Sequence, residues 1–356
     1  MTRVPLSEEE LVKTRMNSGM PLVAIVGVGG AGNNLLTQAI VGGISPDHCI
    51  AVNNDRSELS RSPAINKVLL DGGRLENGEA GLQQVNHQRM SQLSAHRVTP
   101  FTSQSDVTIV IAGLGGGTAT STAPLIAQWT RTSIHPVISI VAIPFIHERE
   151  RRFVALRGLK HMVESCDCTV VVDNAMEDDR YSHSGRQADE KVSMVIQGLT
   201  QLISRIHSPL VSEVLRIMGL GEIAVACSSP VGHAGSFQTA ILEALENPSA
   251  RLPIEKTKGA ILLHRGAQKM GDGEAAQAYE VLVSLIGKNI EFVHASIVSP
   301  CESTISILLT GYEYGTAVHT FVDFIEDLYD VEYGQPGVGP TSAIQFPLFQ
   351  MEVPEA

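Results

Sequence analysis

The sequence has no long apolar run, few cysteines and a deficit of basic side chains. No uninterrupted apolar run reaches the roughly 18 residues that a helix needs to span a bilayer, and the charged N-terminal stretch MTRVPLSEEELVKTR contains no signal segment. The sequence therefore predicts a cytoplasmic protein. The net charge is −12, from 26 basic and 38 acidic residues. This balance argues against nucleic acid as a ligand, because a phosphate backbone binds basic surfaces.

The number and spacing of the five cysteines argue against a zinc or redox site. They are odd in number and scattered, and Cys166-Asp-Cys168 lacks the two-residue gap of common zinc and redox pairs. We therefore expect reduced, structural thiols and identify no metal-ligating side chains. The chain has 356 residues, 43% hydrophobic and 18% charged, which is enough for two globular domains.

The stretch AGLGGGTATSTAP (Ala112–Pro124) lies between an apolar run, Val107–Ala112, and an apolar, helix-like segment that begins at Pro124. Its closely spaced glycines indicate a tight turn that brings backbone N–H groups near a ligand, and not side-chain packing, because glycine has no side chain. Short hydroxyls follow that can cap the next helix or donate to anion oxygens: Thr118, Thr120, Ser121 and Thr122. A strand, a glycine-rich turn and a helix N-terminus together predict an anion site. A plain strand-to-helix turn is the alternative.

A second glycine-rich turn occurs upstream, in LVAIVGVGGAGNN. Leu22–Val26 is expected to be a buried parallel strand. The predicted turn contains Gly27, Gly29, Gly30 and Gly32, and Asn33 and Asn34 are expected to open a helix that continues to Ile40. The glycine spacing also matches the dinucleotide fingerprint, and Asp55, after the next strand, is placed where a ribose-binding acid could lie. A nicotinamide-dependent Rossmann enzyme is therefore a competing interpretation at this point.

Strands and helices alternate over about 170 residues, which predicts right-handed crossovers and a parallel, doubly covered sheet. Polar or glycine-rich turns follow the strands, at the edge where ligands bind in open α/β sheets. A long helix with an apolar face is predicted at 187–206. The pattern after this helix predicts an α+β arrangement. Its predicted strands are Ile223–Ser228, Lys258–His264, Ile290–Ser299 and Ser303–Gly311, and its predicted helices are Ser236–Glu246 and Gly273–Ile286.

The predicted fold is therefore α/β, with a parallel-sheet nucleotide-binding domain, a long central helix and a smaller α+β second domain. The expected boundaries are an N-terminal arm (1–20), a nucleotide-binding domain (21–186), the central helix (187–206), the second domain (207–332) and a tail (333–356). The tail is rich in glycine and proline and is expected to be loose.

The stretch GLGGGTATSTAP resembles the signature loop of the tubulin and FtsZ family, which usually reads GGGTGTG or GGGTGSG. The resemblance continues in chain order from about residue 22 to about residue 315, and it makes the nicotinamide enzyme a remote alternative. GVGGAGNN is similar to the first nucleotide loop of the family, AVNND to its AVNTD segment, and PFIHERERR to PFxxEGxxR. The loop Asp71–Gly81 stands in the place of the loop that senses the terminal phosphate.

The resemblance implies a binding site for GTP or GDP, with Mg²⁺ held largely by water and phosphate oxygens. The implied nucleotide-binding residues are Gly29, Gly30, Ala31, Gly32, Asn33, Asn34, Asn54, Gly115, Gly116, Gly117, Thr118, Ala119, Thr120, Glu148, Arg152, Asn174 and Asp189. Glu148 and Arg152 match residues that hold the ribose and base. Asp189 matches the acid that reads the guanine edge, where a carboxylate accepts from both N–H donors of guanine.

The sequence departs from the family pattern at several positions. Ala119 and Ser121 replace usual glycines, and a positive φ at Ala119 would be costly. Gly185 falls where an aromatic ring often stacks on the base. The loop that reaches the neighbouring subunit's nucleotide corresponds to 208–214, where Leu210 replaces the first acid and Glu213 occupies the place of the second. One carboxylate can in principle orient or deprotonate a water. A surface acid without a catalytic role is the alternative for Glu213.

The resemblance implies a GTPase that forms head-to-tail filaments, an open heterologous assembly, with Glu213 of the next subunit as the catalytic residue. Its first partner is thus a second copy of itself. The apolar tail segment Ile344–Pro354 is expected to dock on the chain's own surface, and a short partner-binding peptide is the alternative. Another FtsZ-family protein, or a membrane-anchor protein bound through this tail, is therefore a further candidate partner. The alternative is a nucleotide-binding scaffold, or a regulator of a standard FtsZ, with weak or no hydrolysis.

Overall fold

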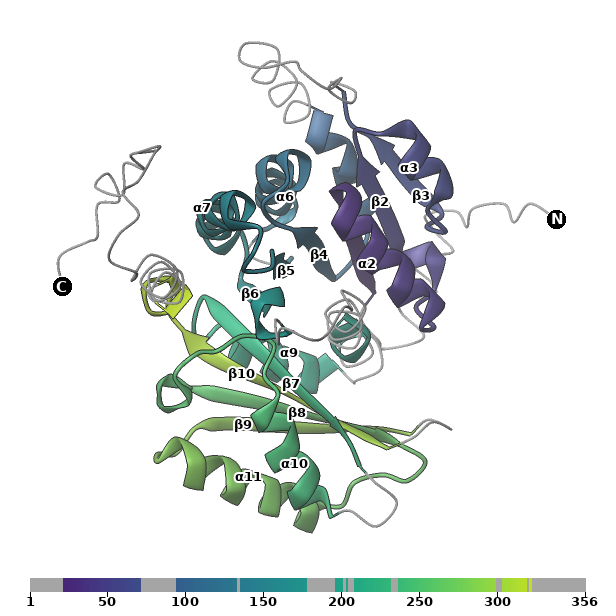
Figure 1. The fold of residues 1–356 in the computed structure, drawn as a ribbon. Helices are drawn as coiled ribbons and strands as arrows, with labels where there is room; N and C mark the ends of the chain where they lie inside the picture. The colour runs from purple at the N-terminus through teal and green to yellow at the C-terminus, as the bar shows by residue number, and fades with distance from the viewer. Residues whose placement is uncertain are drawn as a thin grey trace, which may run out of the picture.

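A computed structural model of the chain (Figure 1) describes residues 22–71, 94–132, 135–177, 196–200, 203, 208–231, 236–298, 303–318 and 320–321. Within these ranges no helix is long and apolar enough to cross a membrane. The predicted arm, the tail and most of the predicted central helix lie outside the described residues. Of that helix, residues 196–200 and 203 are helical.

The described strands form one sheet in the order β3-β2-β1-β4-β5-β6-β7-β10-β8-β9. The strands of its first part are parallel to one another. They are β1 (Val23–Val28), β2 (Cys49–Asn53), β3 (Asn66–Leu69), β4 (Val107–Gly113), β5 (Val137–Ile143) and β6 (Cys168–Asp173). β1, β2 and β6 are buried along their whole length, as apolar parallel strands covered on both faces are expected to be.

The second part of the sheet contains β7 (Ile223–Pro230), β8 (Gly259–Gly266), β9 (Glu291–Val298) and β10 (Thr304–Tyr312). β10 lies between β7 and β8 and is antiparallel to both, whereas β9 is parallel to β8 at the edge. β7 pairs in parallel with β6 through three residue pairs, Thr169–Val171 with Ile223–Val225. The sheet therefore passes without interruption from the first predicted domain into the second.

Helices cover both faces of the sheet (Figure 1). One face is covered by α6 (Gly117–Thr130), α7 (Arg149–Ser165), α10 (Phe237–Glu246) and α11 (Asp272–Ile286). The other is covered by α2 (Gly29–Val41), α3 (Arg56–Arg61), α9 (Ser208–Met218) and residues 196–203 where described. A short helix, α5 (Thr99–Thr102), precedes β4. Alternate residues of β1 show the division, because Val26 packs in the first core and Ile25 in the second.

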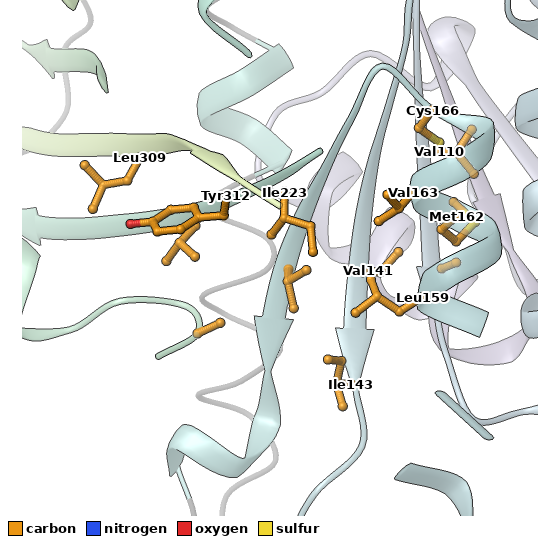
Figure 2. Close-up of a cluster of buried hydrophobic side chains, with 14 of the residues drawn as sticks. Val110, Val141, Ile143, Leu159, Met162, Val163, Cys166, Ile223, Leu309 and Tyr312 are labelled. Carbon is orange, nitrogen blue, oxygen red and sulfur yellow. The ribbon is translucent and has the colours of Figure 1, made fainter. Parts of the chain in front are cut away.

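The first core runs through both parts of the molecule (Figure 2). Leu159, Met162 and Val163 of α7 face Val141 of β5, while Ile223 and Tyr312 continue the cluster into the second part. Burial of this apolar surface stabilises the fold by roughly 25 cal/mol per Å². The two parts therefore share one apolar interior.

The predicted elements are largely confirmed, with corrections at the helix starts. Gly27 lies inside β1, and α2 already begins at Gly29 instead of at Asn33. Helix α6 begins at Gly117, well before Pro124, which lies within it. The segment 208–214, expected as a loop, is the first part of α9.

The cysteines that the structure describes are free and buried, as expected: Cys49, Cys166, Cys168 and Cys227. Burial raises the pKa of the Cys49, Cys166 and Cys227 thiols to about 12. These thiols stay protonated at neutral pH, which suits inert structural residues.

Candidate functional site

The two glycine-rich turns meet at the carboxyl edge of neighbouring strands β1 and β4. A Cβ built on Gly29 would lie 3.1 Å from Cβ of Ala119. A Cβ on Gly113 would overlap the Cβ of Ala31. The turns are about 85 residues apart in the chain, yet their backbones are in contact.

Two helix N-termini are thereby placed side by side. Helix α2 begins at Gly29 and α6 at Gly117, and the first N–H groups of a helix have no partner within it. The N-cap of α6, Gly116, has no side chain, and a Cβ added at Gly116 or at Gly117 would meet no atom within 4 Å. Open space in front of unpaired amides is the geometry of an anion site.

The glycines outside this open space are packed tightly, and at Gly115 this corrects the expectation that the glycines of the second turn do not pack. A Cβ on Gly32 would lie 2.6 Å from the carbonyl oxygen of Ile111, and one on Gly27 would lie 2.8 Å from the carbonyl oxygen of Gly32. Gly115 has φ +90°, and its Cβ would lie 2.5 Å from the Arg151 carbonyl oxygen. The glycines thus let the turns and helices approach one another as well as a ligand.

The hydroxyls of the second turn do not cap α6, contrary to one of the two roles expected of them, because no side chain caps this helix. The hydroxyl of Thr120 accepts from the Gly115 amide (2.9 Å), so that amide is occupied inside the turn. Ser121 and Thr122 donate to the carbonyls of Gly117 and Thr118, at 2.7 and 2.6 Å. Because α6 starts early, these residues lie in its first turns. Ala119 is also helical, and the described residues contain no non-glycine residue with positive φ, so the expected strain is absent.

Thr118 ties the second turn to the end of β2. Its hydroxyl donates to Oδ1 of Asn54 at 3.2 Å. The adjacent Asn53 is 2% exposed, and its Oδ1 accepts from the Asn54 amide at 2.8 Å. Asp55, the candidate ribose acid of the Rossmann interpretation, caps α3 by accepting from the Ser57 amide at 2.8 Å. The loop after β2 is therefore fixed beside both glycine turns.

Glu58 is a residue of this edge that the sequence did not reveal. Its Oε2 accepts from Nδ2 of Asn53 at 2.6 Å. A Cβ built on Gly30 would lie 3.3 Å from the same oxygen. The carboxylate therefore stands against the first turn of α2. No sequence pattern separates it from an ordinary surface acid of a short helix.

Arg152, whose nucleotide contact stays a prediction, forms a buried ion pair that the sequence did not reveal. It is 1% exposed, and its two terminal nitrogens donate to the carboxylate of Asp173 at 2.6 and 2.7 Å. One of them also donates to the Pro144 carbonyl at 2.7 Å. Its Nε is buried without a partner among the described residues. The other expected ribose residue, Glu148, accepts from the Phe145 amide and pairs with Arg151.

Two buried amide oxygens at this edge lack a hydrogen-bond donor among the described residues: Oδ1 of Asn33 and Oδ1 of Asn174. Asn33 is 6% exposed and donates to the carbonyls of Gly29 and Val52, both at 2.9 Å. Asn174 directly follows β6. Unpaired buried acceptors are rare, and a ligand with N–H donors would satisfy them. Asn34, beside Asn33, is exposed on α2.

Glu213 lies on the opposite side of the fold. It is exposed on α9, and it makes no ion pair within the described part of the chain. Helix α9 ends shortly before the amino end of β7, and Thr310 binds the Ile217 carbonyl there at 2.9 Å. Because β7 runs parallel to β6, this edge is opposite the glycine turns. Leu210, which replaces an acid, is half-buried against the core.

Some predicted residues lie outside the described part, namely Asp189, Gly185 and all of Asp71–Gly81 except Asp71. The carboxylate of Asp71 binds Arg97 at 3.0 and 2.7 Å, and its amide donates to Ser94 at 2.8 Å.

Known proteins resemble both the sequence and the fold. Residues 22–177 match the family described as "Tubulin/FtsZ family, GTPase domain". Cell division protein FtsZ 1 of Methanocaldococcus jannaschii is 27% identical over 314 residues, 85% of each chain. An empty FtsZ dimer from M. jannaschii has a TM-score of 0.68 at 22% identity, covering 86% of this chain and 93% of that one. A GTPγS-bound protofilament of CetZ2 from Haloferax volcanii has a TM-score of 0.66 at 21% identity, covering 87% and 99%.

The matched residues include both glycine turns, the loop after β2 and the Arg152–Asp173 pair. The order of the motifs, the contact between the two glycine turns and the fold therefore all point to the same group of proteins. Residues 22–177 thus match the GTPase-domain model of the tubulin/FtsZ family, and the chain has the fold of the FtsZ and CetZ structures.

Proposed function

We propose that this chain binds GTP at the contact between its two glycine turns, with Mg²⁺, and hydrolyses it between subunits of a head-to-tail filament. The observation that carries this proposal is the open space at Gly116 and Gly117 beside the first turn of α2. The unpaired amides of both helix N-termini would hold phosphate oxygens. The buried acceptor Oδ1 of Asn174 would suit an N–H donor of guanine.

The residues present fit Mg²⁺ as an ion bound mainly through phosphate and water. The described residues contain no group of three or more His, Cys, Asp or Glu side chains that could enclose a metal. Mg²⁺ commonly keeps several waters and uses one or two carboxylates with substrate phosphates. Asn54 and Glu58 supply oxygen atoms beside the turns.

The position of Glu213 supports hydrolysis in trans. Glu213 lies at the edge of the sheet opposite the glycine turns. It would reach a nucleotide only if this edge of one subunit stacks on the glycine-turn edge of the next. There it would orient or deprotonate the attacking water. CetZ2 of Haloferax volcanii, which has a similar fold, is known as a protofilament with GTPγS bound, so assembly in rows is compatible with this fold.

An experiment with two variants tests whether one subunit supplies the pocket and the next supplies Glu213. Glu213→Gln should lower phosphate release by at least about 100-fold, the usual contribution of a general base, with GTP affinity unchanged. Gly117→Glu should abolish GTP binding, because its carboxylate repels phosphate while an acid still suits a helix N-terminus. Mixing the two inactive proteins should restore turnover, since one interface then has an intact pocket and an intact Glu213.

Glu246→Gln is the matched control, because Glu246 is an exposed acid on the opposite face of the sheet. It should hydrolyse GTP like the wild type. Full turnover by Glu213→Gln, or no recovery in the mixture, would contradict hydrolysis in trans.

A scaffold or regulator with weak hydrolysis is the second candidate, and one observation favours it. Leu210 is packed against the core where an acid was expected, so α9 presents one carboxylate and no second. Sedimentation with GTP, GDP and a non-hydrolysable analogue, alongside phosphate release, separates the candidates. A scaffold would pellet with GTP without releasing phosphate.

A further inference from the structure

The carboxylate of Glu58 stands beside the first turn of α2, where the proposed site needs positive potential. A Cβ on Gly30 would lie 3.3 Å from its Oε2 and 3.9 Å from its Oε1. Both oxygens therefore lie close to the helix N-terminus that is expected to hold phosphate. A carboxylate and a polyphosphate bound at the same helix N-terminus would repel each other.

This carboxylate is fixed in place and is not a freely rotating surface group. Asn53 is 2% exposed and donates to Oε2 of Glu58 at 2.6 Å. Asp55 caps the helix that carries Glu58 and accepts from the Glu58 amide at 3.3 Å. The loop is also attached to α6 through the bond from Thr118 to Asn54. The carboxylate of Glu58 therefore cannot withdraw from a ligand without breaking its part-buried hydrogen bond to Asn53.

A buried acceptor next to this position is an independent sign of a ligand. Oδ1 of Asn33 has no donor among the described residues, and Asn33 also bonds to Val52, the neighbour of Asn53. Asn33 and Glu58 are thus bonded to adjacent residues, Val52 and Asn53, at the end of β2. Oxygen atoms of this kind suit a hydrated divalent cation and its waters better than they suit an anion alone.

We propose that Glu58 makes nucleotide binding by this chain depend on Mg²⁺. Without the cation, the carboxylate opposes the polyphosphate; with it, the carboxylate faces a positive charge and favours binding. This inference rests on the proposed GTP site and adds a positioning residue to it. Glu58 acts through the cation and not on the reacting atoms.

The test measures the dissociation constants of GTP and GDP for the full chain, in excess Mg²⁺ and in EDTA. In Glu58→Gln the amide oxygen can still accept from Asn53, so the loop is retained. The ratio of the EDTA constant to the Mg²⁺ constant should fall about tenfold in this variant, mainly through tighter binding in EDTA. Glu58→Ala should show the same fall, because the charge and not the hydrogen bond is responsible.

Asp47→Asn is the matched control. Asp47 is exposed and precedes β2, so it loses the same charge at the opposite edge of the sheet. Its ratio should equal that of the wild type. An unchanged ratio in both Glu58 variants, with normal wild-type binding, overturns this inference and leaves the GTP site intact. A wild type that binds neither nucleotide under either condition overturns the GTP site and this inference together.

Discussion

At the scale of single residues, the burial of Arg152 beside Asp173 is a feature that the sequence did not reveal. Its family position suggested a nucleotide contact, yet the side chain is occupied by Asp173. The sequence could not pair these two residues, because 21 positions separate them and other acids are nearer. Which carboxylate lies opposite a buried arginine is decided by strand order, which only the folded sheet specifies.

This pair predicts a large effect on stability. The side chains of Arg152 and Asp173 are 2% and 7% exposed. Arg152→Met should lower the free energy of unfolding by about 3–5 kcal/mol, because it leaves a buried carboxylate without its partner. Replacing both residues with apolar side chains should recover much of that loss. Urea denaturation followed by circular dichroism measures both changes.

Arg131 provides the comparison, since its pair with Asp167 is 41% and 35% exposed. Arg131→Met should cost less than about 1 kcal/mol, as solvent screens such pairs. Similar losses in the two single variants would show that the burial of Arg152 has no energetic consequence.

At the scale of elements, the sequence placed nearly every strand and helix of the second part correctly, because apolar periodicity is strong there. It started α2 and α6 too late. Glycine predicts turns from local preference, but Gly29, Gly32 and Gly117 are helical here. Glycine is required at Gly32 because α2 and β4 approach too closely for a side chain. It also missed β3, a short edge strand with only one buried residue.

This close approach predicts opposite outcomes for two glycines of the same helix. Gly32→Ala should destabilise the protein by about 1–3 kcal/mol, since the new methyl would meet the Ile111 carbonyl oxygen at 2.6 Å. Gly30→Ala should be neutral or stabilising by up to about 1 kcal/mol, because its nearest neighbour is the side-chain end of Glu58 and alanine favours a helix. Thermal denaturation without nucleotide compares them. A destabilised Gly30→Ala with an unaffected Gly32→Ala would contradict this account of the packing.

The strands of the second part are joined by a histidine whose charge state affects their stability. His264 of β8 bonds to Ser296 of β9 at 3.0 Å and to Ser303, just before β10, at 2.8 Å. Burial lowers the pKa of His264 below its ordinary 6.5, against a smaller opposing effect of Glu274. The unfolded chain therefore binds a proton at higher pH than the folded one.

Stability should consequently fall as the pH drops below about 7, through the range between the unfolded and the lowered folded pKa. His264→Gln should flatten this slope. Unfolding free energies measured at pH steps from 7.5 to about 5 test the prediction, with His48→Gln, an exposed histidine, as the control. Equal slopes in the wild type and His264→Gln would remove His264 as the source.

At the scale of the whole molecule, the sequence predicts two domains, whereas the described strands form one continuous sheet. β6 and β7 pair through only three residue pairs, but Ser249 reinforces the junction. Its hydroxyl donates to the Val171 carbonyl at 2.6 Å and accepts from the Ala226 amide at 3.0 Å. The sequence predicted a change from an α/β to an α+β pattern after the central helix, but it contained no sign of a strand that extends the first sheet. Such a contact is long-range and leaves no local pattern.

The shared core and this junction predict that the two parts unfold together. Ser249 is 3% exposed, so Ser249→Ala should leave buried groups of β6 and β7 unpaired and lower stability by about 1–3 kcal/mol. Native-state hydrogen exchange should show the slowest amides of β4 and of β8 opening with the same free energy, and both should fall equally in the variant. Ser103→Ala, at an exposed hydroxyl, should change neither. If only the amides of one part became faster, the parts would be separate cooperative units, and the continuous sheet would join them without coupling their stability.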